Sequence, residues 1–301
     1  FGYLKIAEGC DKHCTYCIIP KLRGKFRSVP MERLVTQAKE MAEEGVKELI
    51  LVAQETTVYG TDIYGKKSLH ILLKELCKIK GIRWIRILYC YPEEIYDELI
   101  QTMKEEKKIC HYLDLPIQHA SDRILKRMGR RTTQAELVEI VNKLRREIPD
   151  IVLRTTLISG FPGETQEDHE ELMGFVDEME FDRLGVFTYS AEEDTPAATM
   201  EDQIPEEVKE ARRDEIMELQ QEISLEKGES RVGQVLTVMI EGKVSGESAY
   251  IGRTYGDAPK VDGYIFVQTG ELLMTGDFAR VRVTGALEYD LIGELEDEYT
   301  E

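Results

Sequence analysis

The chain has 301 residues, 32% of them charged, and a formal net charge of −19 at pH 7. A chain of this length forms one large domain, or a large domain with a small one. Its acidity disfavours direct nucleic-acid binding, which needs Lys and Arg to neutralise phosphates, and favours a basic protein partner. No apolar run reaches membrane-spanning length and no signal peptide is visible, so we expect a cytoplasmic protein with no membrane contact.

From the N-terminus to about Phe187, apolar β-rich runs alternate with amphipathic helical patterns. The predicted strands are 3–7, 48–52, 84–88, 112–115, 151–158 and 184–188. The predicted helices are 31–44, 69–79, 93–105, 133–147 and 166–179. Repeated strand–helix units indicate a parallel sheet with helices packed outside it. About six units are too few for a closed eight-fold barrel, so we expect an α/β fold with an open, partial (β/α)6 barrel.

The C-terminal part changes in pattern. A charged helix is predicted over 205–227, as a connector without a functional role, and five short β runs separated by glycines follow it. The β runs are 234–241, 249–253, 264–268, 278–284 and 290–294. They predict a small antiparallel β-barrel of oligonucleotide-binding type. The expected domains are 1–200 for the partial barrel, 201–228 for the connector and 229–301 for the small barrel, whose net charge of −8 does not suit a phosphate-binding surface.

Three of the six cysteines, Cys10, Cys14 and Cys17, are spaced C-x3-C-x2-C in a loop after the first predicted strand. A structural zinc site needs four ligands, and an ordinary iron–sulfur cluster needs four thiolates. Three thiolates on a four-iron cluster leave one iron open for a substrate or cofactor. The spacing therefore favours such a cluster, although a zinc site with His13 as the fourth ligand, or unrelated thiols, remain alternatives.

The other three cysteines, Cys77, Cys90 and Cys110, lie in apolar segments and are expected to be buried free thiols. A long chain with clustered cysteines does not indicate a disulfide framework. A reduced compartment fits this pattern.

Polar residues follow the later predicted strands, where chemistry collects in parallel barrels. They are Gln54 and Glu55, Gln118 and His119, and the Gly160-Phe161-Pro162-Gly163-Glu164 turn. Glycine in such a turn allows a bound adenosine to approach the backbone, although Pro-Gly pairs also simply form turns. Arg154 lies within a strand, where a buried cation needs a carboxylate from the protein or from a cofactor.

The cysteine loop, with Tyr16 just before its last cysteine, resembles that of the radical S-adenosylmethionine (SAM) enzymes. Further stretches resemble the methylthiotransferase branch of these enzymes, and the small barrel resembles its TRAM domain. These stretches are 9–20, Arg23-Gly24, 121–125, 160–165 and 190–198. The run Leu115-Pro116-Ile117-Gln118-His119-Ala120-Ser121 resembles the RimO type, whereas the branch that modifies transfer RNA typically has Leu-Pro-x-Gln-Ser-Gly-Ser.

The resemblance implies a radical enzyme that adds a methylthio group to the β-carbon of an aspartate in small-subunit ribosomal protein S-twelve, either free or within the small ribosomal subunit. It implies a 4Fe-4S cluster on Cys10, Cys14 and Cys17 with SAM at the open iron. It also implies a second 4Fe-4S cluster in an N-terminal domain that this chain lacks, which agrees with a start at Phe1 rather than at Met. A low-potential donor such as flavodoxin or ferredoxin would supply electrons, and a monomer is expected.

The roles of the supporting residues are our own hypotheses. Gln54, Glu55 and Arg154 would contact SAM at its methionyl and ribose ends, and Gly160 to Gly163 would contact its adenosine. Tyr16 is a further candidate for binding the cofactor. Gln118 and His119 would face the substrate. For His119 the alternative is a strand-end histidine bonded within the protein, and for Glu55 a solvated loop acid. Two other functions stay open: a transfer-RNA adenosine methylthiotransferase and a non-catalytic, metal-bearing ribosome-binding protein.

Overall fold

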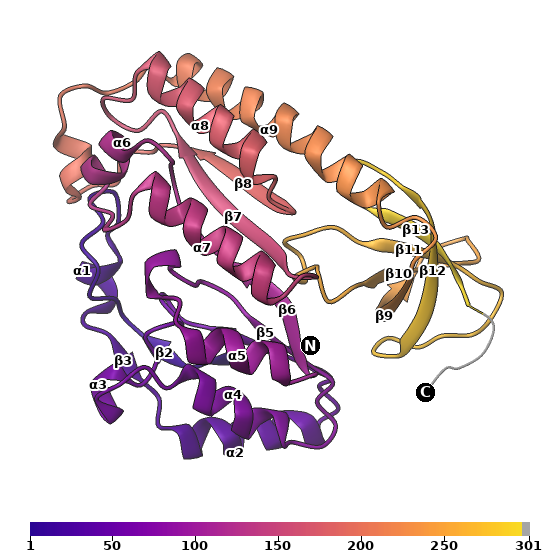
Figure 1. Ribbon diagram of the computed structural model, residues 1–301. Coiled ribbons are helices and arrows are strands. Elements are labelled where there is room, and N and C mark those ends of the chain that lie inside the picture. Colours follow the sequence, from indigo (N-terminus) through magenta and orange to yellow (C-terminus); the bar gives the residue numbers. More distant parts are fainter. Residues whose placement is uncertain (297–301) are drawn as a thin grey trace.

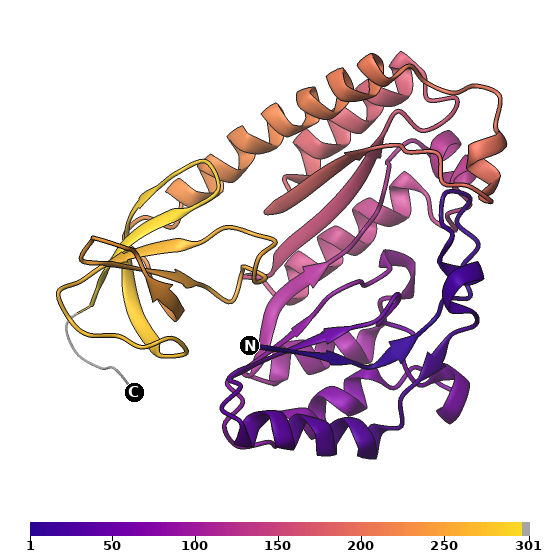
Figure 2. The same ribbon diagram turned by 180° about the vertical axis from the view of Figure 1, so that it is seen from behind.

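The computed structural model describes residues 1–296, and its larger part is an open six-stranded sheet (Figures 1 and 2). All neighbouring strands run parallel, in the order β1-β4-β5-β6-β7-β8. The strands are β1 (Gly2–Lys5), β4 (Glu48–Val52), β5 (Trp84–Ile87), β6 (Ile109–Asp114), β7 (Val152–Ser159) and β8 (Arg183–Thr188). This confirms the predicted partial barrel.

Helices cover the outer face of the sheet, because each strand returns to the next through an amphipathic helix. The main helices are α2 (Met31–Glu43), α4 (Leu69–Cys77), α5 (Asp97–Glu105), α7 (Gln134–Glu147) and α8 (Gln166–Met179). Shorter ones are α1 (Ile19–Arg23), α3 (Thr61–Tyr64), α6 (Asp122–Arg127) and the 3-10 turns η1 (Pro92–Glu94) and η2 (Pro196–Thr199). The largest apolar core lies between these helices and the sheet.

The long helix α9 (Glu206–Glu229) lies along β7, β8 and α8 and leads to a closed five-stranded barrel. The barrel strands are β9 (Val235–Lys243), β10 (Ala249–Arg253), β11 (Ile265–Gln268), β12 (Phe278–Ala286) and β13 (Leu291–Leu295). The barrel has its own apolar core. The last five residues of the predicted barrel unit, 297–301, lie outside the described residues.

The barrel packs on the inner face of the sheet, near the N-terminal ends of the strands. Met239, Ala258 and Phe278 of the barrel meet a cluster of sheet residues that includes Trp84 and Tyr112. The Trp84 and Phe278 rings meet edge to face with centroids 4.9 Å apart. The opposite ends of the strands stay clear of the barrel, and the cysteine loop lies there (Figure 1).

The structure corrects three predictions. The small barrel is not wholly antiparallel, because β11 and β13 pair in parallel. The strand predicted over 3–7 is interrupted at Ile6, whose carbonyl accepts a hydrogen bond from Val29, so that β2 (Ala7–Glu8) pairs with β3 (Arg27–Ser28) instead of β4. The helix predicted over 93–105 is broken, because the backbone is extended at Ile95 and Tyr96 between η1 and α5.

Candidate active site

Two of the three clustered cysteines line a cavity of about 410 Å³ at the C-terminal ends of β1 and β4, and the third lies beside one of its lining tyrosines. Cys10 and Cys17 line it directly, together with Gln54, Tyr89 and Tyr91. The Cys14 sulfur lies 3.6 Å from the Tyr91 hydroxyl. The structure therefore brings the predicted cluster ligands and Gln54 together.

The loop that carries the cysteines is held by backbone contacts at both ends. Gly9 has a φ of +85°, and a Cβ there would overlap the carbonyls of Gly24 and Lys25, so only glycine fits. The Gly9 amide donates to Gln54 Oε1 at 2.8 Å. At the other end, the Thr15 amide donates to the Met128 carbonyl at 2.9 Å. Gln54 thus supports the loop as well as lining the cavity.

Cys10 and Cys17 are protonated thiols in these surroundings. Burial, reinforced by neighbouring thiols and Glu55, raises the pKa of Cys10 to about 11, and burial also raises the pKa of Cys17. In residues 1–296, no three His, Cys, Asp or Glu side chains converge on a point that one metal ion would occupy. The three thiolates of a four-iron cluster each bind a different iron, so they are arranged around the cluster and need not converge on a single point. His13, the alternative zinc ligand, is exposed.

A buried cation stands beside these thiols. The Arg130 guanidinium lies over the Tyr91 ring, 4.3 Å from its centroid, and its Nη2 is 3.3 Å from Glu93 Oε2. Its Nε and Nη1 are buried and have no hydrogen-bond partner. A buried cation with free donors suits an anionic neighbour, so Arg130 fits a negatively charged thiolate-bound cluster at this place.

Glu55 is buried rather than solvated, which excludes the loop-acid alternative. Its Oε1 accepts hydrogen bonds from the Thr57 amide and hydroxyl, while its Oε2 is buried without a partner. Burial raises the pKa of Glu55 to about 7, although its bonds to Thr57 act in the opposite direction. A carboxyl with one free oxygen, balanced between two protonation states near neutral pH, suits a polar ligand.

His119 is fully buried and bonded within the protein. Its Nδ1 accepts from the Ser121 amide at 3.0 Å, and its Nε2 points to Glu164 Oε2 at 3.5 Å. Glu164 also accepts from the Gly160 amide, so the histidine connects the end of β6 to the glycine turn. Gln118 beside it is half-buried, with a φ of +72°. These contacts match the alternative of a strand-end histidine bonded within the protein.

The glycine turn packs tightly against protein side chains. A Cβ at Gly160 would overlap Lys209 of α9, and a Cβ at Gly163 would lie 2.8 Å from the Arg127 guanidinium carbon. Tyr16 meets Phe161 of this turn edge to face, with centroids 6.4 Å apart. The structure thus brings Tyr16 and the turn together, and the close approach that these glycines allow is to Lys209 and Arg127.

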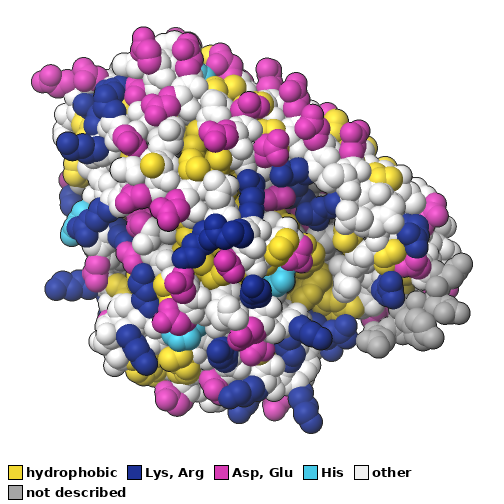
Figure 3. All heavy atoms as spheres, in the orientation of Figure 1, with side chains coloured by type: hydrophobic (Ala, Val, Ile, Leu, Met, Phe, Trp, Pro, Cys, Tyr) yellow, Lys and Arg dark blue, Asp and Glu magenta, His cyan; other side chains and the backbone are white. Residues whose placement is uncertain are grey.

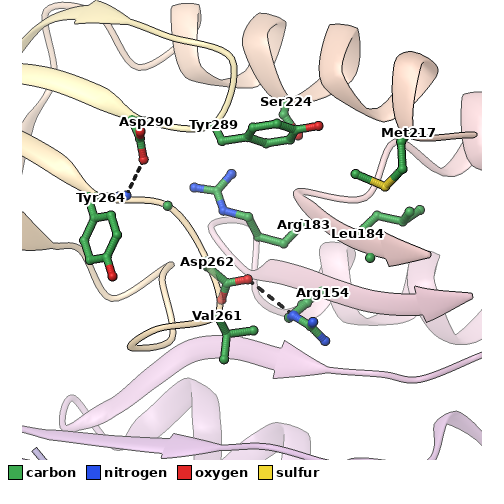
Figure 4. A pocket seen from close by; sticks show the side chains of 12 residues that line it. Arg154, Arg183, Leu184, Met217, Ser224, Val261, Asp262, Tyr264, Tyr289 and Asp290 are labelled. Carbon is green, nitrogen blue, oxygen red and sulfur yellow. Dashed lines mark hydrogen bonds and ion pairs between the residues drawn. The ribbon is translucent and has the colours of Figure 1, made fainter. Parts of the chain in front are cut away.

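Arg154 lies elsewhere. Its Nη1 donates to Asp114 Oδ1 at 2.8 Å, and its Nε lies 3.3 Å from Asp262 Oδ1 of the small barrel. It lines a cavity of about 380 Å³ between the sheet and the barrel, with Arg183 and Tyr289 (Figure 4). The cation predicted to need a carboxylate has two from the protein, and it does not share the cysteine cavity.

Sequence reasoning missed three residues that shape the site: Tyr89, Tyr91 and Arg130. The first two follow β5 in the run Tyr89-Cys90-Tyr91-Pro92, which indicates a strand end but no ligand. Tyr89 is 47% exposed with a φ of +60°, an uncommon backbone conformation for a bulky residue. Arg130 follows α6 in Met128-Gly129-Arg130-Arg131, where nothing distinguishes it from its exposed neighbour Arg131.

Comparison with known proteins agrees with this geometry. Residues 4–176 match the radical SAM superfamily and residues 232–295 match the TRAM domain. In solved structures, the fold resembles TsrM, a radical SAM methyltransferase from Kitasatospora setae (TM-score 0.55, 16% identity, 66% of this chain and 38% of that one). The chain belongs to the radical SAM superfamily.

Two bacterial relatives narrow this class. Ribosomal protein uS12 methylthiotransferase RimO of Lachnoclostridium phytofermentans is 68% identical over 98% of this chain and 67% of the relative. The protein of the same name from Clostridium perfringens is 59% identical over 97% of this chain and 65% of the relative. Within the superfamily the chain belongs to this methylthiotransferase family, and it spans about two thirds of the length of these relatives.

Proposed function

We propose that this chain is the radical SAM and TRAM part of a methylthiotransferase that modifies the β-carbon of an aspartate in ribosomal protein S-twelve (uS12). The observation that carries the proposal is the C-x3-C-x2-C loop, of which Cys10 and Cys17 line one cavity at the C-terminal strand ends, in a chain 68% identical to a relative of that name. The acidic small barrel supports a basic protein substrate.

The residues at the cavity fit a cluster with SAM. Cys10, Cys14 and Cys17 would bind three irons after losing their thiol protons, as metal-bound cysteines do. When bound, the cluster and SAM supply a carbon radical strong enough to remove hydrogen from an unactivated carbon. A second cluster, on cysteines outside these 301 residues, belongs to the same proposal, as do a cytoplasmic location, a low-potential electron donor and a monomeric state.

Residues of this chain position and tune the site. Gln54 holds the cysteine loop through the Gly9 amide. Arg130 offsets negative charge beside Cys14 and Tyr91. Below pH 7 the Glu55 carboxyl is protonated, and because its Oε1 accepts from Thr57, its free Oε2 would carry the proton and donate to a ligand. Above pH 7 the same oxygen would be charged and would accept from a hydrogen-bond donor of the ligand.

The test is mass spectrometry of S-twelve after incubation with a protein in which this chain follows the cluster-bearing N-terminal domain. The mixture contains reconstituted clusters, SAM, a reductant and a sulfur source. A methylthio adduct on one aspartate is the expected result. If S-twelve stays unmodified while transfer RNA gains the group, the substrate is wrong and the radical chemistry stands. If neither gains it and no iron binds, a non-catalytic role replaces the proposal.

A further inference from the structure

We infer that the surface around the cysteine loop is a docking site for an acidic electron-carrier protein, such as a flavodoxin. The inference rests on the proposed radical chemistry, which consumes one electron for each SAM cleaved. The carrier would lose that electron and the cluster would gain it, with no bond formed between the two proteins.

The first observation is the distribution of charge along the chain. Residues 12–27 hold five Lys or Arg and no acid, and residues 122–131 hold five Lys or Arg and one acid. The rest of the chain holds 29 Lys and Arg against 57 Asp and Glu. We call the two segments together the basic collar. Both segments carry a net positive charge, although the chain as a whole is strongly negative. The overall composition therefore does not reveal this local basic feature.

The second observation is that the fold joins the two segments at the cysteine loop. The Thr15 amide donates to the Met128 carbonyl at 2.9 Å, and the Thr15 hydroxyl donates to the Arg127 carbonyl at 2.8 Å. Gly129 lies so close to the His13 carbonyl that a Cβ would come within 2.7 Å of its oxygen. Two stretches more than 90 residues apart in the chain thus form one surface beside Cys14 and Cys17.

Most cations of the collar are exposed and available to a partner. Lys25, Lys126 and Arg131 are exposed and have no ion pair among the described residues. Lys21 and Arg23 are 60% and 57% exposed, and each lies more than 3.7 Å from its nearest acidic oxygen. Four other collar cations have acidic partners. Lys12 and Arg130 point inward to Glu94 and Glu93, and Arg123 and Arg127 pair with Asp168 and Asp202. In Figure 3, Lys and Arg gather at the edge where Figure 1 places α1 and α6, whereas Asp and Glu dominate over α8 and α9.

An exposed apolar residue stands within these charges. Leu22 of α1 is 69% exposed, between Lys21 and Arg23. Protein interfaces combine an apolar centre with a polar rim, and phosphate groups of RNA would leave Leu22 without a partner. The only aromatic residues of residues 12–27, Tyr16 and Phe26, are partly buried or buried, so the collar has no exposed ring for base stacking. The chemistry therefore favours an acidic protein over RNA.

The collar is also close to the centre that needs the electron. Leu22 lies five residues after Cys17 in the sequence, so the two backbones are at most about 18 Å apart even if the chain between them were fully extended. A carrier docked over α1 would bring its redox group near the edge of the cluster. Opposite charges would steer the encounter and raise its rate.

The test measures flavodoxin binding to this chain without iron, by calorimetry at low and high salt. The collar variant is Lys25→Glu with Lys126→Glu and Arg131→Glu, and the matched control is Lys39→Glu with Lys74→Glu and Lys80→Glu, three exposed lysines on α2, on α4 and just after α4. We expect the collar variant to raise the Kd about tenfold at low salt, and the control to change it less than about twofold. Leu22→Ser should raise the Kd about fivefold.

Reduction kinetics of the reconstituted protein give a second readout. The collar variant should slow reduction of the cluster by flavodoxin hydroquinone about tenfold. Reduction of the cluster by the methyl viologen cation radical should be equally fast or faster. Equal Kd values for wild type, collar variant and control would overturn the inference. So would unchanged flavodoxin affinity with a loss of binding to small-subunit ribosomal RNA, which would make the collar an RNA surface. Flavodoxin binding is measured without iron, so it does not depend on the methylthiolation assay. Failure of that assay would therefore count against the proposed function and not against the docking site.

Discussion

Buried charged groups lie at both ends of the six-stranded sheet, but the two ends differ in how many of these groups have partners within the protein. At the barrel end, Glu48 accepts from Arg86 at 2.7 Å and from Arg253 of the barrel at 2.6 Å. At the cysteine end, Glu55 Oε2 and two Arg130 nitrogens are buried without partners. At the barrel end the buried carboxylate is paired with two cations, although one Arg86 nitrogen has no partner, whereas at the cysteine end the free Glu55 oxygen and two Arg130 nitrogens keep unused hydrogen-bonding capacity.

The difference separates a structural role from a functional one. The two arginines outweigh the burial that would raise the pKa of Glu48, so that its pKa is lowered, whereas burial with few partners raises the pKa of Glu55. A paired buried charge stabilises one arrangement of the two domains. An unpaired buried group costs stability and is retained where a ligand completes it. Four experiments test this contrast.

The largest effect is expected at the cysteine end. Cys14→Ala should abolish a stable four-iron cluster, because two thiolates cannot replace three, whereas His13→Ala should leave it intact. Iron content and charge-transfer absorbance after anaerobic reconstitution measure both. A Cys14→Ala protein with a full cluster would contradict the ligand assignment, and a colourless wild type with bound zinc would favour the zinc alternative.

The second largest effect is expected at the barrel end of the sheet. Arg253→Met removes the cation that joins Glu48 to Glu241, and leaving buried charge unpaired costs about 3–5 kcal/mol of unfolding free energy. The matched control is Arg280→Met in the same barrel, where an exposed ion pair contributes under about 1 kcal/mol. Urea unfolding can follow Trp84, the single tryptophan, which packs against Phe278 of the barrel. Equal losses in both variants would contradict the contrast.

A pH dependence should distinguish Glu55 from Glu48. In the iron-free chain the folded pKa of Glu55 is about 7, above its ordinary value of 4.5, so the folded state binds the extra proton and stability falls as pH rises between these values. The loss is on the order of 2 kcal/mol. Glu55→Gln should remove this slope when unfolding is measured from pH 5 to pH 8. Glu48, with a lowered pKa, loses its contribution only as pH falls below its ordinary range. A variant with the wild-type slope would show that another group titrates.

The smallest effect is expected for His119→Asn. The amide oxygen can still accept from the Ser121 amide, but the contact with Glu164 is lost, which costs about 1 kcal/mol of stability. The KM for S-twelve should change less than about twofold, since the side chain is buried. Gln118→Ala, at the half-buried neighbouring position, is the comparison. A large rise in KM for His119→Asn alone would restore the substrate-facing role.

The sequence by itself determined most of the architecture. Strand–helix alternation predicted the parallel sheet, and α8 and β4 have the predicted bounds, because buried parallel strands and amphipathic helices have distinct periodicities. The cysteine spacing indicated the cluster site for a similar local reason, since a loop of eight residues cannot send its thiols far apart. The parallel β11–β13 pair was not predictable, because strand direction depends on a distant closure of the barrel.

Only the tertiary structure decided which polar residues share a site. In the sequence, Gln54, Glu55 and His119 were alike as polar groups after strand ends, and Arg154, within a strand, was an equal candidate for binding the cofactor. The fold sends Arg154 to the barrel interface and buries His119 against Glu164, while Gln54 stays at the cysteine cavity. It also brings Arg130 next to Cys14 and joins the two halves of the basic collar. Such pairings depend on contacts between segments far apart in the chain, which local periodicity and spacing do not encode.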